Sequence, residues 1–383
     1  MHKDFDTFYN NINLLIRRSK SREIKNILIS QASGIGDAII STPFIRETHR
    51  LYPWANIYLV IPNQHVPIYA ENNYIKVFSF NPDTTNMFTI LKDIVNFSVD
   101  KLLHKNIDIA FSPMFDPKIT MLFLNWLSGA PIRVGYGKHT KSMYFKDQNY
   151  YLQTFGQEFN FDKYLLTDLI YNPPSMFHEI DRRLYVLEKF CDTKIYNKKL
   201  ELFTQEKDIS HLLTNKKKIV FGLGGSSKNK KWPMDKWQIV LNEFKDNYTC
   251  YIVGDINDQI DINDDKIINL IGKISIEETI TLIKASDIYV GHDTCLVHVA
   301  SAYNKPCVVL YKEAMDKDKI IPGFLSFYHR YKPLTKSICI RPDKTAKECK
   351  NIYVEGHCSS EDSHCIKSIS PIKVIKAIHK LLK

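Results

Sequence analysis

The chain lacks any long uninterrupted apolar run. No stretch of its 383 residues approaches the ~18 apolar residues that a membrane-spanning helix needs. Charged side chains repeatedly interrupt residues 1–30, which therefore lack the apolar core of a secretory signal peptide. The sequence predicts neither a membrane span nor export, and it favours the cytoplasm.

The sequence also lacks the features of several other protein classes. It has no low-complexity tract, no repeat at solenoid spacing, and no CxxC pair among its eight cysteines. Without an export signal, these cysteines are expected to be thiols rather than disulfides. Hydrophobic residues at 44% and charged residues at 25% are typical of globular proteins. We therefore expect the whole chain to fold, and its length indicates about two domains.

The net charge of +10 favours anionic partners, which include nucleic acids, phosphorylated small molecules and anionic membrane surfaces. The lysines are scattered and no nucleic-acid module is present, so we expect no nucleic-acid partner. Residues 5–18 show an amphipathic helical pattern, with Phe5, Phe8, Ile12, Leu15 and Ile16 on one side. Such a helix could pack on the protein's own surface or lie at a membrane surface.

Both halves of the chain repeat one pattern, in which a short apolar run leads through a glycine-bearing turn into a helical pattern. This pattern predicts an α/β fold with two Rossmann-like, doubly wound parallel sheets. The expected strands cover 26–30, 57–61, 76–80, 107–111, 218–223, 250–253, 287–291 and 307–311. The expected helices cover 38–52, with Pro43 in its first turn, and 233–244, 276–285 and 370–382.

Two stretches are candidate links between the domains, namely residues 172–175 with two prolines and the charged stretch at 193–215, and we expect the boundary between about 190 and 215. We place the domains at 1–195 and 196–369, followed by a terminal helix at 370–383. Doubly wound sheets bind ligands at the carboxyl ends of their strands. The active site is therefore expected in a cleft between the two sheets.

The first motif is SQASGIGDAIISTPFIR at residues 30–46. Gly34 and Gly36 permit close approaches to the backbone, and the helix that follows offers unpaired N–H groups to an anion or an acceptor. We therefore expect both glycines among the donor-binding residues. Asp37 lies at the start of this helix, where it either caps the helix or acts as a general base.

The second motif is IVFGLGGSSKNKKWPMDKW at residues 219–237. A strand leads into Gly225, Ser226 and Ser227, then into lysines that include Lys230 and Lys231, and then into a helix. Backbone N–H groups, hydroxyls and a lysine at a helix start suit a diphosphate, although the spacing is not that of a Walker loop. The alternative is a turn with solvated lysines.

The third motif, at residues 275–311, contains a strand, the loop GHDTCLVH and another helix. Asp293 and Thr294 follow the strand, where such sheets hold their ligands. The alternative is that Asp293 or Thr294 caps the helix and that His298 belongs to the core.

Together, SGIGDAIISTPFIRETHRLYPWANIYLVIP, KKWPMDKW and SDIYVGHDTCLVHVASAYNKPCVVLY resemble, in this order, the three signatures of glycosyltransferase family 9, the lipopolysaccharide heptosyltransferases. The resemblance implies a GT-B architecture, in which an acceptor-side domain and a nucleotide-sugar domain face a central cleft. It also implies inverting transfer of heptose from ADP-heptose to a lipopolysaccharide core acceptor, without a catalytic metal. The terminal helix then crosses back to the first domain, and the enzyme works peripherally at the inner membrane face.

The resemblance assigns roles by motif position. Asp37 resembles the catalytic base, and Lys230 resembles the lysine that stabilises the departing diphosphate. Ser226 matches a phosphate-contacting hydroxyl and Glu277 matches the acid that holds the donor ribose. The sugar- and phosphate-binding loop corresponds to Asp293, Thr294 and His298.

The sequence departs from the family pattern after Asp-Thr, where Cys295 replaces the usual glycine. Lys231 could also replace Lys230 in the phosphate role. Because of Cys295, the alternative stays open that the chain binds a nucleotide sugar without catalysing transfer.

Four cysteines gather in the tail, namely Cys339, Cys349, Cys358 and Cys365. They could hold a structural zinc or iron, or they could be free thiols. A resemblance to autotransporter-modifying heptosyltransferases with a cysteine-bound iron offers protein O-heptosylation as an alternative activity.

Overall fold

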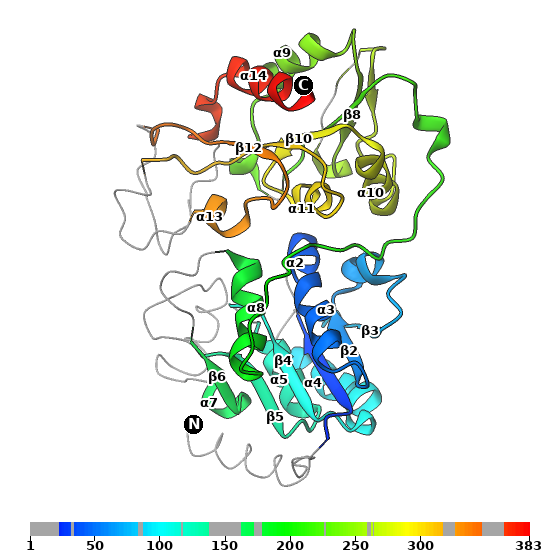
Figure 1. The fold of residues 1–383 in the computed structure, drawn as a ribbon, viewed down its shortest axis with the longest axis vertical. Coiled ribbons are helices and arrows are strands. Elements are labelled where there is room, and N and C mark those ends of the chain that lie inside the picture. The colour runs from blue at the N-terminus through cyan, green and yellow to red at the C-terminus, as the bar shows by residue number, and fades with distance from the viewer. Residues whose placement is uncertain are drawn as a thin grey trace. The chain divides into compact units, whose positions relative to one another are not determined.

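The computed structural model describes residues 23–31, 34–82, 87–115, 118–137, 162–171, 178–225, 227–258, 262, 264–316, 326–346 and 364–383. The chain divides into two compact units, Met1–Lys198 and Lys199–Lys383. Each unit is built around its own parallel β-sheet covered by helices (Figure 1).

The sheet of the first unit has the strand order β3-β2-β1-β4-β5-β6, and all its pairs are parallel. Its strands are β1 (Asn26–Ser30), β2 (Asn56–Ile61), β3 (Ile75–Ser79), β4 (Ile109–Ser112), β5 (Ile132–Tyr136) and β6 (Asp168–Ile170). The helices are α2 (Ile35–Ile40), α3 (Thr42–Leu51), α4 (Met87–Phe97), α5 (Ile119–Leu127), α7 (Asp162–Leu165) and α8 (Glu179–Phe190). The central strands β1 and β4 are almost entirely buried, as expected for a parallel sheet with helices on both faces.

The sheet of the second unit has the order β12-β11-β10-β7-β8-β9 and is also parallel throughout. Its strands are β7 (Lys218–Gly222), β8 (Thr249–Val253), β9 (Ile267–Asn269), β10 (Ile288–His292), β11 (Cys307–Leu310) and β12 (Ser337–Ile340). The helices are α9 (Met234–Phe244), α10 (Ile276–Ala285), α11 (Cys295–Ala302), α13 (Phe327–Tyr331) and α14 (Pro371–Leu382). The two predicted doubly wound sheets are therefore both present.

The terminal helix α14 packs inside the second unit. Its buried side chains Val374, Ala377, Ile378 and Leu381 recur at helical spacing and join the core cluster that contains Trp237 and Phe244 of α9. The sequence led us to expect that this helix would cross back to the first domain. Its apolar stripe is instead buried against α9 and the sheet of its own unit, because that core offers the matching apolar surface.

The helix predicted at 38–52 is two helices, α2 and α3, which meet at Ser41. Pro43 has no N–H to donate to the carbonyl of Ile39, which a continuous helix would require. The Thr42 hydroxyl donates to that carbonyl instead, at 2.8 Å. The proline thus ends a short first helix and starts the second, and Asp37 lies on the short one.

Each sheet reverses its strand order between two central strands. The reversal lies between β1 and β4 in the first unit and between β7 and β10 in the second. Doubly wound sheets bind ligands outside the carboxyl ends of the strands at such points. The loops after β1, β7 and β10 carry the three sequence motifs, so each motif lies at a switch point.

None of the helices in the described part of the chain has the length and apolar character of a membrane span. The amphipathic segment predicted at 5–18 lies outside the described residues, so that expectation stays a prediction.

Candidate functional site

Asp37 in the first unit forms an ion pair with a buried arginine. The Arg183 guanidinium Nη2, from α8, donates to Asp37 Oδ1 at 2.6 Å. The Arg183 side chain is 1% exposed, whereas the Asp37 side chain is 22% exposed. One carboxylate oxygen is therefore held from the interior, and the described residues offer no hydrogen-bond donor to the other.

Asp37 does not cap its helix. The N-cap position of α2 is Gly34, and no side chain makes a capping hydrogen bond there. Gly34 has extended backbone, and a Cβ atom built on it would meet nothing within 4 Å. The space beside this helix start is therefore open, and the capping alternative for Asp37 is not supported.

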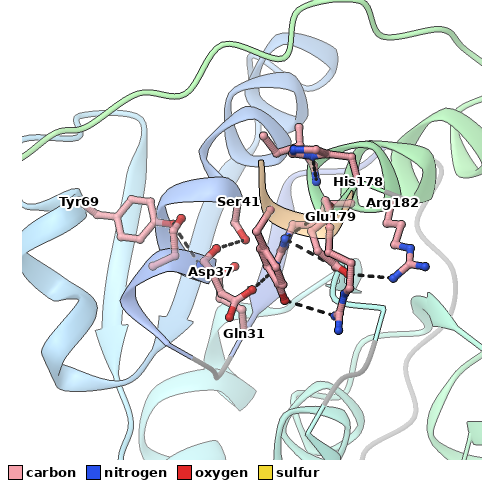
Figure 2. A network of polar contacts seen from close by, with 12 residues as sticks. Gln31, Asp37, Ser41, Tyr69, His178, Glu179 and Arg182 are labelled. Carbon is pink, nitrogen blue, oxygen red and sulfur yellow. Dashed lines mark hydrogen bonds and ion pairs between the residues drawn. The ribbon is translucent and has the colours of Figure 1, made fainter. Parts of the chain in front are cut away.

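A second arginine on α8 anchors that helix. Arg182 Nη1 forms a buried ion pair with Glu179 Oε1 at 2.8 Å, and its guanidinium lies 4.2 Å from the ring centroid of Phe115. The hydroxyl of Tyr136, the last residue of β5, donates to the Arg182 carbonyl at 2.5 Å. These contacts set the position of α8 and hence that of Arg183, and Figure 2 shows the network around Asp37.

Helix α2 is held from the other side by Tyr69. The Tyr69 hydroxyl donates to the carbonyl of Ala38 at 2.6 Å and accepts from Gln31 Nε2 at 3.1 Å (Figure 2). Ser41 also bonds back to the carbonyl of Asp37 at 2.8 Å. The short helix therefore holds Asp37 on a backbone that side chains fix at several points.

The glycine-rich loop after β7 carries the predicted lysines of the second unit. Lys230 Nζ lies 3.4 Å from Asp293 Oδ2 and 3.3 Å from the Asp293 carbonyl oxygen. Lys231 Nζ lies 2.7 Å from Oδ1 of Asp258, whose side chain is 6% exposed. Lys231 is thus held in a close ion pair, while the contact of Lys230 with Asp293 is looser. Both lysines make ion pairs, whereas Lys228 of the same loop is exposed, so the diphosphate-binding role of the loop stays a prediction.

His292, the last residue of β10, joins the two halves of this loop. Its Nε2 accepts from the Trp232 N–H at 2.9 Å, and its Nδ1 lies 3.0 Å from the Gly224 carbonyl oxygen. Burial lowers the pKa of His292 to about 4, so the ring is neutral near pH 7. A neutral ring that accepts at Nε2 carries its proton on Nδ1, which donates to the Gly224 carbonyl. His292 therefore closes the loop that bears Lys230.

The loop after β10 starts helix α11. Thr294 occupies the N-cap position but makes no capping bond, and the carboxylate of Asp293 faces Lys230 instead. His298 is buried, with its ring 6.3 Å from that of Tyr331. Among the described residues, non-glycine positive φ angles occur at Asn106, Asp192 and Asn304. Cys295 does not need glycine's conformational freedom, so its presence leaves the loop backbone unstrained.

Glu277 lies in the first turn of α10. Its neighbour Glu278 forms the capping box with Ser275, in which each side chain accepts a backbone N–H of the other. Glu278 thereby caps the helix, and Glu277 makes no side-chain hydrogen bond within the described part of the chain. Helices of such sheets start at the carboxyl edge, so Glu277 lies at the same edge as Lys230 and Asp293.

Sequence reasoning missed several residues of these two half-sites. Arg183 and His292 hold Asp37 and the lysine loop, and Glu313 is a buried carboxyl. The sequence offered one signal for Arg183, namely the two adjacent arginines of α8. Arginine is rarely buried without a partner, so a buried arginine there implies a carboxylate nearby. The structure brings Lys230 and Asp293 together, and it describes Asp37 in the other unit. Gly36 lies within α2 and Gly225 lies in the loop before Lys230.

Two of the four tail cysteines are described, and both are free: Cys339 and the buried Cys365. Cys349, Cys358 and Ser226 lie outside the described residues. No group of three or more metal-ligating side chains occurs in the part of the chain that the structure covers. The metal site at the tail is not supported by these residues and stays a prediction.

The comparisons with known proteins agree with this architecture. Lipopolysaccharide heptosyltransferase 1 of Campylobacter coli is 23% identical over 184 residues, which cover 43% of this chain and 53% of that protein. The chain thus matches about half the length of this curated relative. A glycosyl transferase family 9 structure from Veillonella parvula DSM 2008 has a TM-score of 0.67 and 20% identity, covering 96% of this chain and 99% of that one.

The E. coli ADP-heptose lps heptosyltransferase II also superposes with a TM-score of 0.67, at 18% identity, covering 93% of this chain and 98% of that one. At these identities the structural likenesses show the fold, which is of the GT-B type. The model of glycosyltransferase family 9 (heptosyltransferase) matches residues 123–322, which is more than half of the chain. The chain therefore belongs to glycosyltransferase family 9, the heptosyltransferase family.

Proposed function

We propose that this protein transfers heptose, or a closely related sugar, from ADP-heptose to a lipopolysaccharide core acceptor, with inversion and without a metal. One observation carries the proposal. A partly exposed carboxylate, anchored on one oxygen by a buried arginine, lies at the switch point of one sheet, and a lysine lies at the switch point of the other. These are the two charged groups that such a transfer needs.

Asp37 is the general base. Arg183 holds Oδ1, so Oδ2 is the oxygen that accepts the proton of the acceptor hydroxyl as that hydroxyl attacks the anomeric carbon. The bond from the anomeric carbon to the diphosphate breaks, and its electron pair leaves with ADP. Attack from the side opposite the diphosphate inverts the configuration.

Lys230 stabilises the departing diphosphate. The close pair of Lys231 with the buried carboxylate of Asp258 supports Lys230, rather than its neighbour, as the phosphate-binding lysine. The N–H groups around Gly225, together with Ser226, Asp293, Thr294 and His298, complete the donor loop. Glu277 holds the ribose, and its uncommitted carboxylate supports that role.

The acceptor is an anionic lipid-linked glycan, which the protein reaches peripherally at the inner membrane face. The net charge of +10 supports an anionic acceptor and an anionic surface. The Campylobacter coli relative is a lipopolysaccharide heptosyltransferase, which supports this acceptor class. ADP-heptose is named for the E. coli enzyme of similar fold.

The test measures ADP release by purified protein with ADP-heptose and heptose-deficient lipopolysaccharide. Asp37→Asn should bind ADP-heptose within about threefold of wild type and lose at least a hundredfold in kcat, because general-base catalysis contributes about 10²–10⁴. Asp100→Asn, at an exposed aspartate of the same unit, is the matched control and should keep full activity.

Four outcomes would contradict the proposal. Preference for UDP- or GDP-sugars would exclude the ADP-heptose donor, and full activity of Asp37→Asn would exclude the base. Donor binding without turnover on either lipopolysaccharide or an autotransporter protein would favour the silent binding protein. Turnover on the autotransporter protein alone would mean that the acceptor is a protein and not a lipopolysaccharide core.

A further inference from the structure

A second lysine lies at the carboxyl edge of the sheet, beside Lys230. Lys312 comes two residues after the end of β11, the strand that pairs with β10. Its Nζ donates to Asn229 Oδ1 at 3.2 Å, and Asn229 directly precedes Lys230 in the chain. The strand end after β11 is thereby tied to the loop after β7.

One aromatic ring gathers the cations of this edge. The ring centroid of Phe327, the first residue of α13, lies 4.7 Å from Lys230 Nζ and 5.5 Å from Lys312 Nζ. The Arg330 guanidinium lies 6.0 Å from the same centroid. The face of an aromatic ring attracts a cation, so Phe327 favours the presence of both lysines beside it.

Gathering like charges has an electrostatic cost that the ring offsets only in part. The carboxylate of Asp293, 3.4 Å from Lys230 Nζ, offsets part of the repulsion between these cations, and a further anion beside them would offset more. A diphosphate can be that further anion, because each of its two phosphates carries negative charge. The loop after β7 adds backbone N–H groups, so the surroundings suit phosphate oxygens.

We propose that Lys312 is a second cationic contact for the donor's diphosphate, and that Phe327 holds Lys312 and Lys230 in position to bind it together. This inference rests on the proposed function and adds a residue to its donor site. As the bond between the anomeric carbon and the phosphate oxygen breaks, the electron pair stays on that oxygen. Two ammonium groups stabilise the resulting charge better than one.

The experiment compares the affinities of ADP and AMP by calorimetry, using the full chain. Lys312→Gln should weaken ADP binding by about tenfold or more and AMP binding by less than threefold, because one phosphate cannot engage both lysines. Lys312→Arg keeps the charge and should restore ADP affinity to within about threefold. Lys336→Gln is the matched control, since this exposed lysine lies before β12, at the opposite edge of the sheet.

A second variant covers the case in which Lys312→Gln fails to fold. Phe327→Leu fills similar space without a π-face and should weaken ADP binding by about threefold. Equal losses for ADP and AMP, or no loss for ADP, would overturn the role of Lys312. If the wild-type protein binds no nucleoside diphosphate at all, the proposed function itself fails, which is a distinguishable result.

Discussion

At the scale of the residue, the candidate base depends on a side chain far away in sequence. Arg183 is 146 positions from Asp37, yet it holds Oδ1 at 2.6 Å from a buried position. Arg183 also lies 3.9 Å from Glu179 Oε2, so its guanidinium lies between two carboxylates. We interpret Arg183 as a positioning residue, because it acts on the reaction only through Asp37.

Replacing Arg183 tests this interpretation. Arg183→Met should lower kcat at least tenfold while the KM for the donor changes less than threefold, because the donor groups lie on the other unit's loops. It should also lower the free energy of unfolding by about 2–4 kcal/mol, since a buried ion pair is broken. Arg183→Lys keeps the charge and should recover part of kcat. Steady-state kinetics with both substrates measure kcat and the donor KM separately. A rise in the donor KM as large as the fall in kcat would refute the positioning role.

Glu313 is a second residue with an unusual environment. Burial raises its pKa to about 7, from an ordinary value near 4.5. The unfolded chain releases this proton first as the pH rises, so folding stability falls between about pH 4.5 and 7. The loss is at most about 3 kcal/mol.

Glu313→Gln should remove that loss. Relative to wild type, the variant should gain stability between pH 5 and pH 8, whatever constant cost the amide adds at both pH values. Chemical denaturation at the two pH values measures the difference, with the exposed Glu71→Gln as control. An unchanged difference between variant and wild type across this range would show that Glu313 does not titrate as described.

At the scale of the element, one strand end organises the donor loop. His292 at the end of β10 bonds to both Gly224 and Trp232, which flank the lysines. Its ring also packs edge-on against Trp237 of α9 at 5.5 Å. Strand, loop and helix are therefore held by one neutral imidazole.

His292→Ala should leave a buried N–H and a buried carbonyl without partners, at a cost of about 1–3 kcal/mol each. We expect lower stability together with at least tenfold weaker ADP binding, since the loop that bears Lys230 loosens. The wild-type pKa of about 4 means that acid opposes folding below about pH 6.5, where the unfolded histidine takes up a proton. Stability should therefore rise with pH from about 4 to 6.5.

The rise in folding stability with pH caused by His292 is opposite in sign to the fall caused by Glu313. The rise should be absent from the His292→Ala variant. Denaturation at pH 4.5 and 7 checks the pH dependence, with the exposed His379→Ala as control. Unaltered ADP affinity in His292→Ala would show that the loop holds its shape without the imidazole.

Three of the four described strands that sequence patterns failed to predict can be explained. Strands β6 and β9 contain three residues each and lie at sheet edges, so they carry too few apolar side chains to form a recognisable run. Strand β5 was hidden by Arg133, whose guanidinium is buried and donates to the carbonyls of Leu165 and Ala130. The carbonyl of Leu165 is 32 residues away in sequence, so this partner of Arg133 could not be recognised from the neighbouring residues.

At the scale of the whole molecule, the surplus of 52 basic over 42 acidic residues bears on where the protein works. Lysine and arginine near an anionic bilayer surface contribute about 1 kcal/mol each, within a Debye length. We therefore expect binding to vesicles that contain anionic phospholipid and none to purely zwitterionic vesicles. Salt of about 0.5 M should release the protein by screening. Co-sedimentation measures this, and equal binding to both vesicles would exclude an electrostatic surface contact.

The sequence by itself determined the fold class, eight of the twelve strands that the structure describes and the three motifs, because apolar runs and glycine turns are local properties of the chain. It also determined that Asp37, Lys230 and Asp293 follow strands, whereas the central place of those strands in their sheets came from the structure. Only the tertiary structure decided which residues hold these motifs in place. Arg183 holds Asp37, Asp258 holds Lys231, and His292 holds the loop after β7 that bears Lys230. It also decided that α14 packs in the second unit. The physical reason is that an ion pair or a shared core depends on distance in space, which the spacing of residues along the chain does not encode.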